Sequence, residues 1–220
     1  SAQQLTNAGF ETWTSPNNPD GWATWATATG VGANLVTRDT VDKFSGNVSM
    51  KIKTDSIQAG PSKRLTTGFA NYGWASYSPP APLKLGMTAF TGKPDSIFFS
   101  YKYAPTGTDS AVFIITLFGL SGLNYSASYV LGTTSGNWTS IGLVPPSSIP
   151  AGNVDSISLT FQSSKSLGSG LTGSVLNVDN VRFGYRATNV GIQKIADDIK
   201  LAVYPNPVAD VLKIDFTKNE

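Results

Sequence analysis

The feature that most constrains this chain is a series of short apolar runs, each of strand length and bounded by turn-forming residues. The clearest runs occupy residues 48–53, 96–103, 111–118, 156–161 and 175–183. Runs of this length with Gly, Pro and Ser between them are typical of β-strands, and several in series are typical of a sandwich or barrel. Long Pro-, Gly- and Ser-rich connections favour a jelly roll over a meander; they cover residues 78–82, 144–150 and 163–173. The sequence therefore predicts an all-β protein, a jelly-roll β-sandwich of two antiparallel sheets with a short C-terminal β extension.

Composition argues against two classes of partner. Charged residues make up only 14% of the 220 residues, well below the roughly 25% of an ordinary soluble domain. The sixteen basic residues are scattered, and only Lys63 and Arg64 are adjacent, so nucleic-acid binding is not expected. No apolar run approaches the length of about 18 residues that marks a membrane span. A surface built from Ser, Thr and Asn is typical of extracellular proteins.

The chain contains no histidine and no cysteine, which limits the chemistry it can perform. The commonest general base, the thiolate nucleophile and the usual zinc ligands are all missing. Nine carboxylates precede residue 187, with Glu11 the sole Glu among them. No pair stands in a setting that would tune the two acids apart, as glycoside hydrolysis requires. We therefore assign no catalytic residue.

The pattern of apolar and polar residues changes after Tyr185. Residues 1–187 form the predicted sandwich, residues 188–200 a linker, and residues 201–220 two strands around a turn at Pro205–Asn206–Pro207. Two strands cannot bury a stable core alone, so this tail either begins a small domain or packs on the sandwich.

Residues 203–214, with Tyr204, Pro205, Asn206 and Pro207 followed by an alternating strand, resemble the opening of the C-terminal sorting domain of the Bacteroidetes type IX secretion system. The resemblance implies a protein that is secreted or displayed on the cell surface, with the type IX machinery as a partner. Sorting domains usually continue for several more strands, whereas this chain stops at Glu220. The first residues lack the basic and apolar regions of a signal peptide, which we expect to have been removed.

The larger part of the chain resembles a domain family of Bacteroidetes surface proteins named for carbohydrate metabolism. The residues that carry this resemblance are 7–13, 19–22, 92–96, 101–103, 163–165 and 173–181. Residues 9–11, 45–51 and 178–181 are more loosely similar to jelly-roll carbohydrate-binding modules. The resemblance implies a jelly roll and brings no established catalytic residues.

Modules of that kind often hold a structural calcium ion where the first strand meets the last, and Glu11 and Asp179 stand at the matching positions. Carbonyl groups of residues 45–47 could complete the oxygen shell that calcium requires. The alternative is that Glu11 bonds backbone amides or Lys51 and that Asp179 caps the final turn. No other cofactor is expected.

Aromatic residues are the candidates for a ligand site, because sugars stack on exposed flat rings. Trp13 and Trp22 are assigned to the core. Residues 69–77 are interpreted as a loop that offers three rings to a ligand, and a polar strand offers two more. These five candidates are Tyr72, Trp74, Tyr77, Tyr125 and Tyr129.

A tripeptide of Asp, then Ser or Thr, then a small apolar residue recurs at 39–41, 55–57, 95–97, 109–111 and 155–157. It resembles the O-glycosylation sequon of exported Bacteroidetes proteins. The alternative is that each Asp forms a turn just before a strand.

Three functions follow. The first is a non-catalytic glycan-binding module whose partner is a polysaccharide. The second is a structural or adhesive domain that contacts other surface proteins. The third, suggested by the family resemblance alone, is a glycoside hydrolase.

Overall fold

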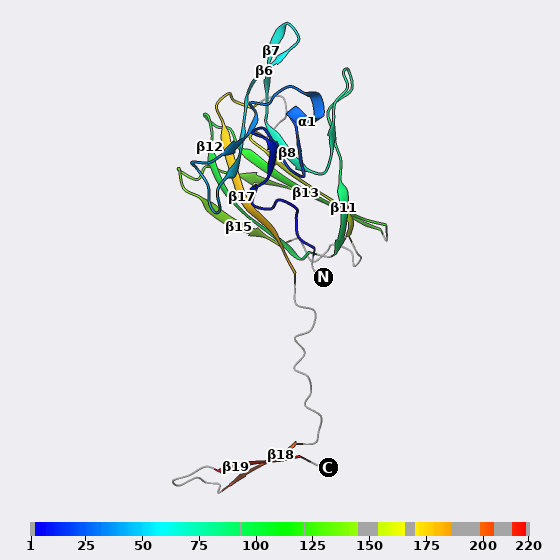
Figure 1. Ribbon diagram of the computed structural model, residues 1–220, viewed down its shortest axis with the longest axis vertical. Coiled ribbons are helices and arrows are strands. Elements are labelled where there is room, and N and C mark those ends of the chain that lie inside the picture. The colour runs from blue at the N-terminus through cyan, green and yellow to red at the C-terminus, as the bar shows by residue number, and fades with distance from the viewer. Residues whose placement is uncertain are drawn as a thin grey trace. The chain divides into compact units, whose positions relative to one another are not determined.

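The computed structural model describes residues 3–92, 94–120, 122–144, 154–165, 170–185, 199–204 and 213–218 (Figure 1). Contacts divide the chain into two compact units, Ser1–Tyr185 and Arg186–Glu220. Among the described residues no helix is long and apolar enough to cross a membrane.

The first unit is built on two antiparallel sheets. One has the strand order β14-β13-β16-β8-β3, with β11 also paired to β16. Its strands are β3 (Trp22–Thr24), β8 (Phe69–Tyr72), β11 (Thr88–Gly92), β13 (Ala111–Gly119), β14 (Leu123–Leu131) and β16 (Val154–Gln162). The other sheet has the order β15-β12-β17-β5-β4. Its strands are β4 (Val36–Asp39), β5 (Ser49–Lys53), β12 (Ser96–Ala104), β15 (Thr139–Leu143) and β17 (Val175–Gly184).

The chain passes repeatedly from one sheet to the other. Strands β12 and β15 belong to one sheet, and β13 and β16 belong to the other. This crossing pattern confirms the predicted jelly-roll β-sandwich. Short pieces decorate it: α1 (Trp25–Thr29) and the ribbons β1 (Trp13–Ser15) with β2 (Asn18–Pro19), β6 (Asp55–Ala59) with β7 (Ser62–Thr66), and β9 (Ala75–Ser76) with β10 (Lys84–Leu85).

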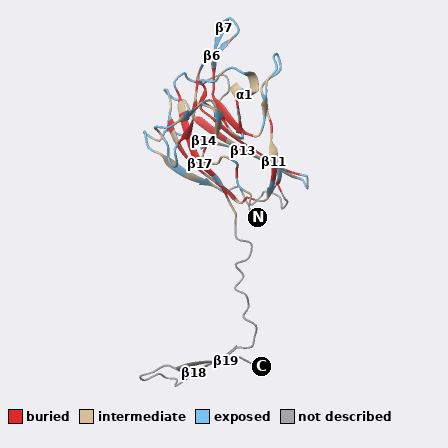
Figure 2. Ribbon diagram, in the orientation of Figure 1, coloured by how far each residue is buried: buried red, intermediate tan, exposed pale blue. Residues whose placement is uncertain are grey.

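The core lies between the two sheets, where buried residues concentrate (Figure 2). Phe99 on β12 meets Phe113 on β13 and Phe161 on β16, with ring centroids 4.8–5.0 Å apart. Each such pair contributes about 0.5–1.5 kcal/mol beyond the area it buries. Trp22 belongs to this core and Trp13 packs against it, which confirms the prediction for both.

A buried polar network contains the three serines of the motifs at residues 163–165 and 173–181. Thr54 Oγ1 lies 2.8 Å from Ser163 Oγ and 2.5 Å from Ser164 Oγ. Ser164 and Ser174 donate their hydroxyls to Asp109 Oδ2 at 2.5 and 2.7 Å. These residues come from separate connections, so the network ties those connections together. The Ser-rich motifs are therefore structural.

Asp95 and Asp109 stand just before β12 and β13, as the turn interpretation of the Asp-Ser/Thr tripeptides predicts. Asp39, Asp55 and Asp155 instead lie within β4, β6 and β16. Asp39 Oδ1 accepts the backbone N–H of Val41 at 3.0 Å. Asp55 and Asp109 each accept the N–H of the following residue, at 2.7 and 2.8 Å. Asp39 ends β4 rather than preceding a strand. O-glycosylation stays a prediction.

The second unit contains β18 (Ile199–Tyr204) and β19 (Lys213–Lys218), paired antiparallel from Ile199↔Lys218 to Tyr204↔Lys213. This pair confirms the predicted C-terminal β extension. The Pro-Asn-Pro turn and residues 188–198 of the predicted linker lie outside the described residues. The last two residues of that linker belong to β18.

Candidate functional site

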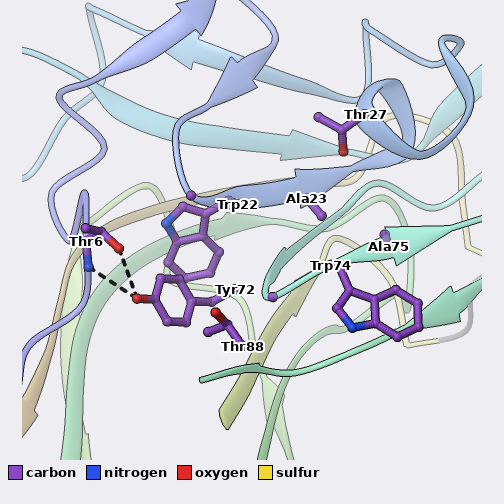
Figure 3. A pocket seen from close by; sticks show the side chains of 10 residues that line it. Thr6, Trp22, Ala23, Thr27, Tyr72, Trp74, Ala75 and Thr88 are labelled. Atoms are coloured by element: carbon purple, nitrogen blue, oxygen red, sulfur yellow. Dashed lines mark hydrogen bonds between the residues drawn. The ribbon is translucent and has the colours of Figure 1, made fainter. Parts of the chain in front are cut away.

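An open hollow of about 500 Å³ lies where β3 and β8 meet the loop that follows β8. Three kinds of residue line it (Figure 3): the aromatics Trp22, Tyr72 and Trp74, the hydroxyl residues Thr6, Thr27 and Thr88, and the small residues Gly21, Ala23, Gly73 and Ala75. Trp74 stands apart from the adjacent rings of Trp22 and Tyr72. The hollow therefore combines flat apolar surfaces with hydroxyl groups.

A buried amide fixes the loop that carries Trp74. Asn71 on β8 is fully buried, and its Nδ2 donates to the carbonyl oxygens of Trp74 (3.0 Å) and Gly86 (2.9 Å). Its Oδ1 accepts the hydroxyls of Ser158 (2.7 Å) and Thr160 (2.8 Å) on β16. Both donors and both acceptor lone pairs of the amide are thereby used. The loop is bonded to the sheet beneath it.

Gly86 allows the indole of Trp74 to lie against backbone, and Gly73 allows the chain to pass close to the carbonyl of Gly86. A Cβ atom at Gly86 would stand 1.8 Å from Cε2 of Trp74, and one at Gly73 would stand 2.1 Å from the carbonyl oxygen of Gly86. Gly73 also has a φ of 144°, which favours glycine. The indole remains 52% exposed. Part of the Trp74 ring thus faces solvent, while another part is held against Gly86.

Trp22 and Tyr72 form the buried wall of the hollow. Their ring centroids lie 5.3 Å apart, and Trp22 also contacts Phe10 at 5.1 Å. The phenol oxygen of Tyr72 lies 3.0 Å from Thr6 Oγ1. Both rings are almost completely buried. Tyr72 therefore lines the hollow but offers a ligand little exposed ring surface.

The interpretation of residues 69–77 as a loop is wrong for residues 69–72 and for Ala75–Ser76, which form β9. Phe69–Tyr72 form β8, whose residues are all buried and which pairs with β16 on one side and β3 on the other. A strand buried on both faces loses the alternation of apolar and polar residues. Asn71 in the sequence then resembles a loop residue, although its buried side chain hydrogen-bonds the loop to β16.

The other three aromatic candidates lie elsewhere. Tyr77 packs edge-on against Trp25, with centroids 5.8 Å apart. Tyr125 and Tyr129 lie on β14, as predicted, with their hydroxyl oxygens 3.3 Å apart, and Tyr129 stacks on Phe113. Burial raises the pKa of Tyr125 to about 12. None of the three lines the hollow; their role in ligand binding stays a prediction.

A second hollow of about 400 Å³ adjoins the first, since Gly21, Trp22 and Thr27 line both. Its remaining lining residues are Thr14, Asn18, Pro19 and Asp20. Asp20 was not predicted as a site residue, although residues 19–22 belong to the family resemblance. Asn18 Oδ1 and Trp22 Nε1 are buried without a hydrogen-bond partner among the described residues. Each such atom typically costs about 1–3 kcal/mol.

Glu11 and Asp179, the predicted calcium ligands, are used by backbone N–H groups. Glu11 Oε1 accepts the N–H of Asn47 at 2.9 Å. The fully buried Asp179 accepts three N–H groups at 2.6–3.0 Å, from Phe44, Ser45 and Asn180. Burial raises the pKa of Asp179, the N–H donors oppose that shift, and the charge of Glu11 adds to it. Glu11 thus bonds a backbone amide, as the alternative predicts. Asp179 lies within β17 and bonds the backbone of Phe44 and Ser45, so the expectation that it caps the final turn is wrong.

Calcium takes six to eight oxygen ligands, whereas this pair supplies at most four, three of which already accept N–H groups. The described residues contain no cluster of three or more acidic or histidine side chains that could hold a metal. The side chains described here therefore do not form a calcium cage by themselves. Calcium binding at this place stays a prediction.

Fold and site together define the class of this chain, a jelly-roll β-sandwich with an open hollow walled by aromatic residues. No family model matches the sequence, and no curated protein matches it. Several solved structures to which it is similar are carbohydrate-binding modules. The family 61 module in complex with β-1,4-galactotriose aligns at 12% identity and a TM-score of 0.47, over 83% of this chain and 98% of that one.

The xylan-binding module CBM22-1 of Paenibacillus barcinonensis Xyn10C aligns at 12% identity and a TM-score of 0.41, over 80% of this chain and 90% of that one. The enzymatically active domain of tailspike protein 4 of bacteriophage CBA120 aligns at 11% and 0.46 over 82% of this chain, which spans only 21% of that protein. Values this low leave the ligand to be inferred from the site itself.

Proposed function

We propose that this chain is a non-catalytic carbohydrate-binding module of a secreted or surface-exposed protein, and that a sugar unit stacks on Trp74. The observation that carries this proposal is the half-exposed indole, held against Gly86 at the mouth of the larger hollow. A ring fixed in place before binding loses little conformational freedom when a ligand arrives.

The rest of the hollow suits the polar edge of a sugar. Apolar C–H faces of the sugar cover the indole while neighbouring polar groups take its hydroxyls. Thr88 lines the hollow, and its hydroxyl makes no hydrogen bond among the described residues. The hydroxyl of Thr6 bonds Tyr72 and keeps a second lone pair. Both can bond a sugar hydroxyl.

Carboxylates are scarce around the two hollows. Asp20 is the one acidic residue among the described residues that line them. Glycoside hydrolysis needs two opposed carboxyl groups, about 5–10 Å apart. This distribution supports binding without cleavage.

Export is the second part of the proposal. The resemblance of residues 203–214 to a type IX sorting domain and the low charge of the chain support a protein that the type IX machinery delivers to the cell surface. Fusion of residues 186–220 to a reporter in a host with that machinery tests it, and a reporter retained in the periplasm contradicts it.

Affinity gel electrophoresis against soluble polysaccharides, including galactan, xylan and hydroxyethylcellulose, tests the glycan site. We expect at least one of them to retard the wild-type chain and Trp74→Ala to abolish the retardation. Phe44→Ala is the matched control, because Phe44 is 45% exposed, contacts Trp138 and lies outside both hollows. Equal retardation of the Trp74→Ala and wild-type chains would refute the site. Absence of any glycan ligand would favour an adhesive domain, and release of reducing ends would favour a hydrolase.

A further inference from the structure

The two adjoining hollows differ in charge. The larger is lined only by uncharged side chains, and the smaller adds one charged residue, Asp20. Of the three ion pairs found among the described residues, none involves Asp20. No Lys or Arg is among the described residues that line either hollow. The combined site therefore carries a negative charge without a counterion.

The position of Asp20 is fixed by its neighbours. Asn7, at a φ of 53°, donates from Nδ2 to the carbonyl oxygens of Thr12 (2.8 Å) and Asp20 (3.0 Å). Asn7 Oδ1 accepts the N–H of Thr12 at 3.0 Å, and Asp20 N–H donates to the Thr12 carbonyl at 3.1 Å. Gly21, at a φ of 81°, then turns the chain toward Trp22. Hydrogen bonds among Asn7, Thr12 and Asp20 thus fix the backbone of Asp20.

One oxygen of the Asp20 carboxylate is free to bond a ligand. Oδ1 accepts the hydroxyl of Thr14 at 2.5 Å, whereas Oδ2 makes no hydrogen bond among the described residues. The residue is half-buried. A carboxylate oxygen without a partner is a strong acceptor for a ligand hydroxyl group, because charge-assisted hydrogen bonds are roughly twice as strong as neutral ones.

We propose that the two hollows form one groove for a neutral oligosaccharide, and that Asp20 is its selectivity residue. One sugar unit stacks on Trp74, and a hydroxyl of a neighbouring unit donates to Asp20 Oδ2. A uronic acid or sulfated sugar would place a second negative charge beside Asp20 with no cation to offset it. This inference rests on the proposed glycan-binding function and names its substrate class.

The expected size of the discrimination follows from Coulomb's law. Two like charges about 4 Å apart in water repel by about 1 kcal/mol, which corresponds to about a fivefold loss of affinity. Because the smaller hollow is open to solvent, salt screens this repulsion, with a Debye length of about 3 Å at 1 M. The discrimination should therefore shrink as salt rises.

The experiment compares matched polysaccharides by affinity electrophoresis at low and high salt. The pairs are hydroxyethylcellulose with carboxymethylcellulose, and galactan with polygalacturonic acid, together with a glycan array that contains neutral, uronic and sulfated glycans. The variants are Asp20→Asn and Asp155→Asn. Asp155 is exposed on β16 and outside both hollows, so its variant changes the net charge equally.

We expect the wild-type chain to bind neutral glycans, and Asp20→Asn to raise binding of anionic glycans relative to neutral ones by about fivefold at low salt. Asp155→Asn should leave that ratio unchanged. A wild-type chain that prefers anionic glycans, or equal ratios for the two variants, would overturn the inference while loss of binding in Trp74→Ala still supports the glycan site. No binding to any glycan would overturn both.

Discussion

Replacing Gly86 by Ala should weaken ligand binding without changing Trp74 itself. The new Cβ would stand 1.8 Å from Cε2, 2.2 Å from Nε1 and 2.3 Å from Cζ2 of the indole, where ordinary contacts are 3.4–4 Å. The ring must therefore move by about 1.6 Å or more. The backbone of Gly86 has no positive φ, so Ala brings no conformational strain of its own.

The size of the effect follows from the exposed area of the ring. A large aromatic side chain presents up to about 250 Å², so an exposure of 52% leaves roughly 130 Å² for a ligand. A sugar that covers half of that buries about 65 Å², worth about 1.6 kcal/mol at 25 cal/mol per Å². Displacing the ring should weaken binding about 15-fold. The buried half of the ring limits the loss of folding stability to about 3 kcal/mol by the same coefficient.

Affinity electrophoresis measures binding, and urea unfolding measures stability. Gly132→Ala is the control, because a Cβ at Gly132 meets nothing within 4 Å; we expect wild-type behaviour from it. A Gly86→Ala chain that is folded and binds the same glycan with wild-type affinity would refute the role of the fixed indole. Equal losses in both variants would refute the steric argument.

The remaining predictions concern stability and metal. Burial raises the pKa of Asp109, but hydrogen bonds from Ser164, Ser174 and the Leu171 N–H outweigh it and leave the pKa below the ordinary value of 3.8. The ionised Asp109 should stabilise the fold above about pH 4, and this contribution should fade as the pH falls through the lowered pKa. Asp109→Asn should therefore lower the free energy of unfolding by about 1–3 kcal/mol at pH 7 and by less at pH 3. An equal loss at both pH values in urea unfolding would contradict this. The calcium site predicted at Glu11 and Asp179 needs backbone carbonyl ligands in addition to the two carboxylates. If it forms, calcium at 100 times its Kd stabilises the domain by about 2.7 kcal/mol and Glu11→Gln abolishes the effect; an unchanged melting temperature in 10 mM calcium would refute the site.

Several strands could be predicted from local sequence with small errors. The runs at 96–103 and 111–118 correspond to β12, Ser96–Ala104, and β13, Ala111–Gly119. Both are dominated by β-branched and aromatic residues between turn residues, so their conformation is decided within the run. β8 was missed because its Asn-containing run matches no periodic pattern. Asp20 was missed because its chemistry depends on the adjoining hollow rather than on its sequence neighbours.

The sequence alone determined an all-β sandwich, a paired C-terminal extension and the absence of imidazole and thiol chemistry, since these follow from composition and local periodicity. It also supplied the aromatic residues, but not their exposure. Whether a ring faces solvent depends on contacts between segments far apart in the chain, such as Asn71 with Ser158 and Thr160 on β16. The same Asn71 side chain bonds the carbonyl oxygens of Trp74 and Gly86, whereas Tyr72 packs against Trp22. Only the tertiary structure could decide which ring a ligand can reach.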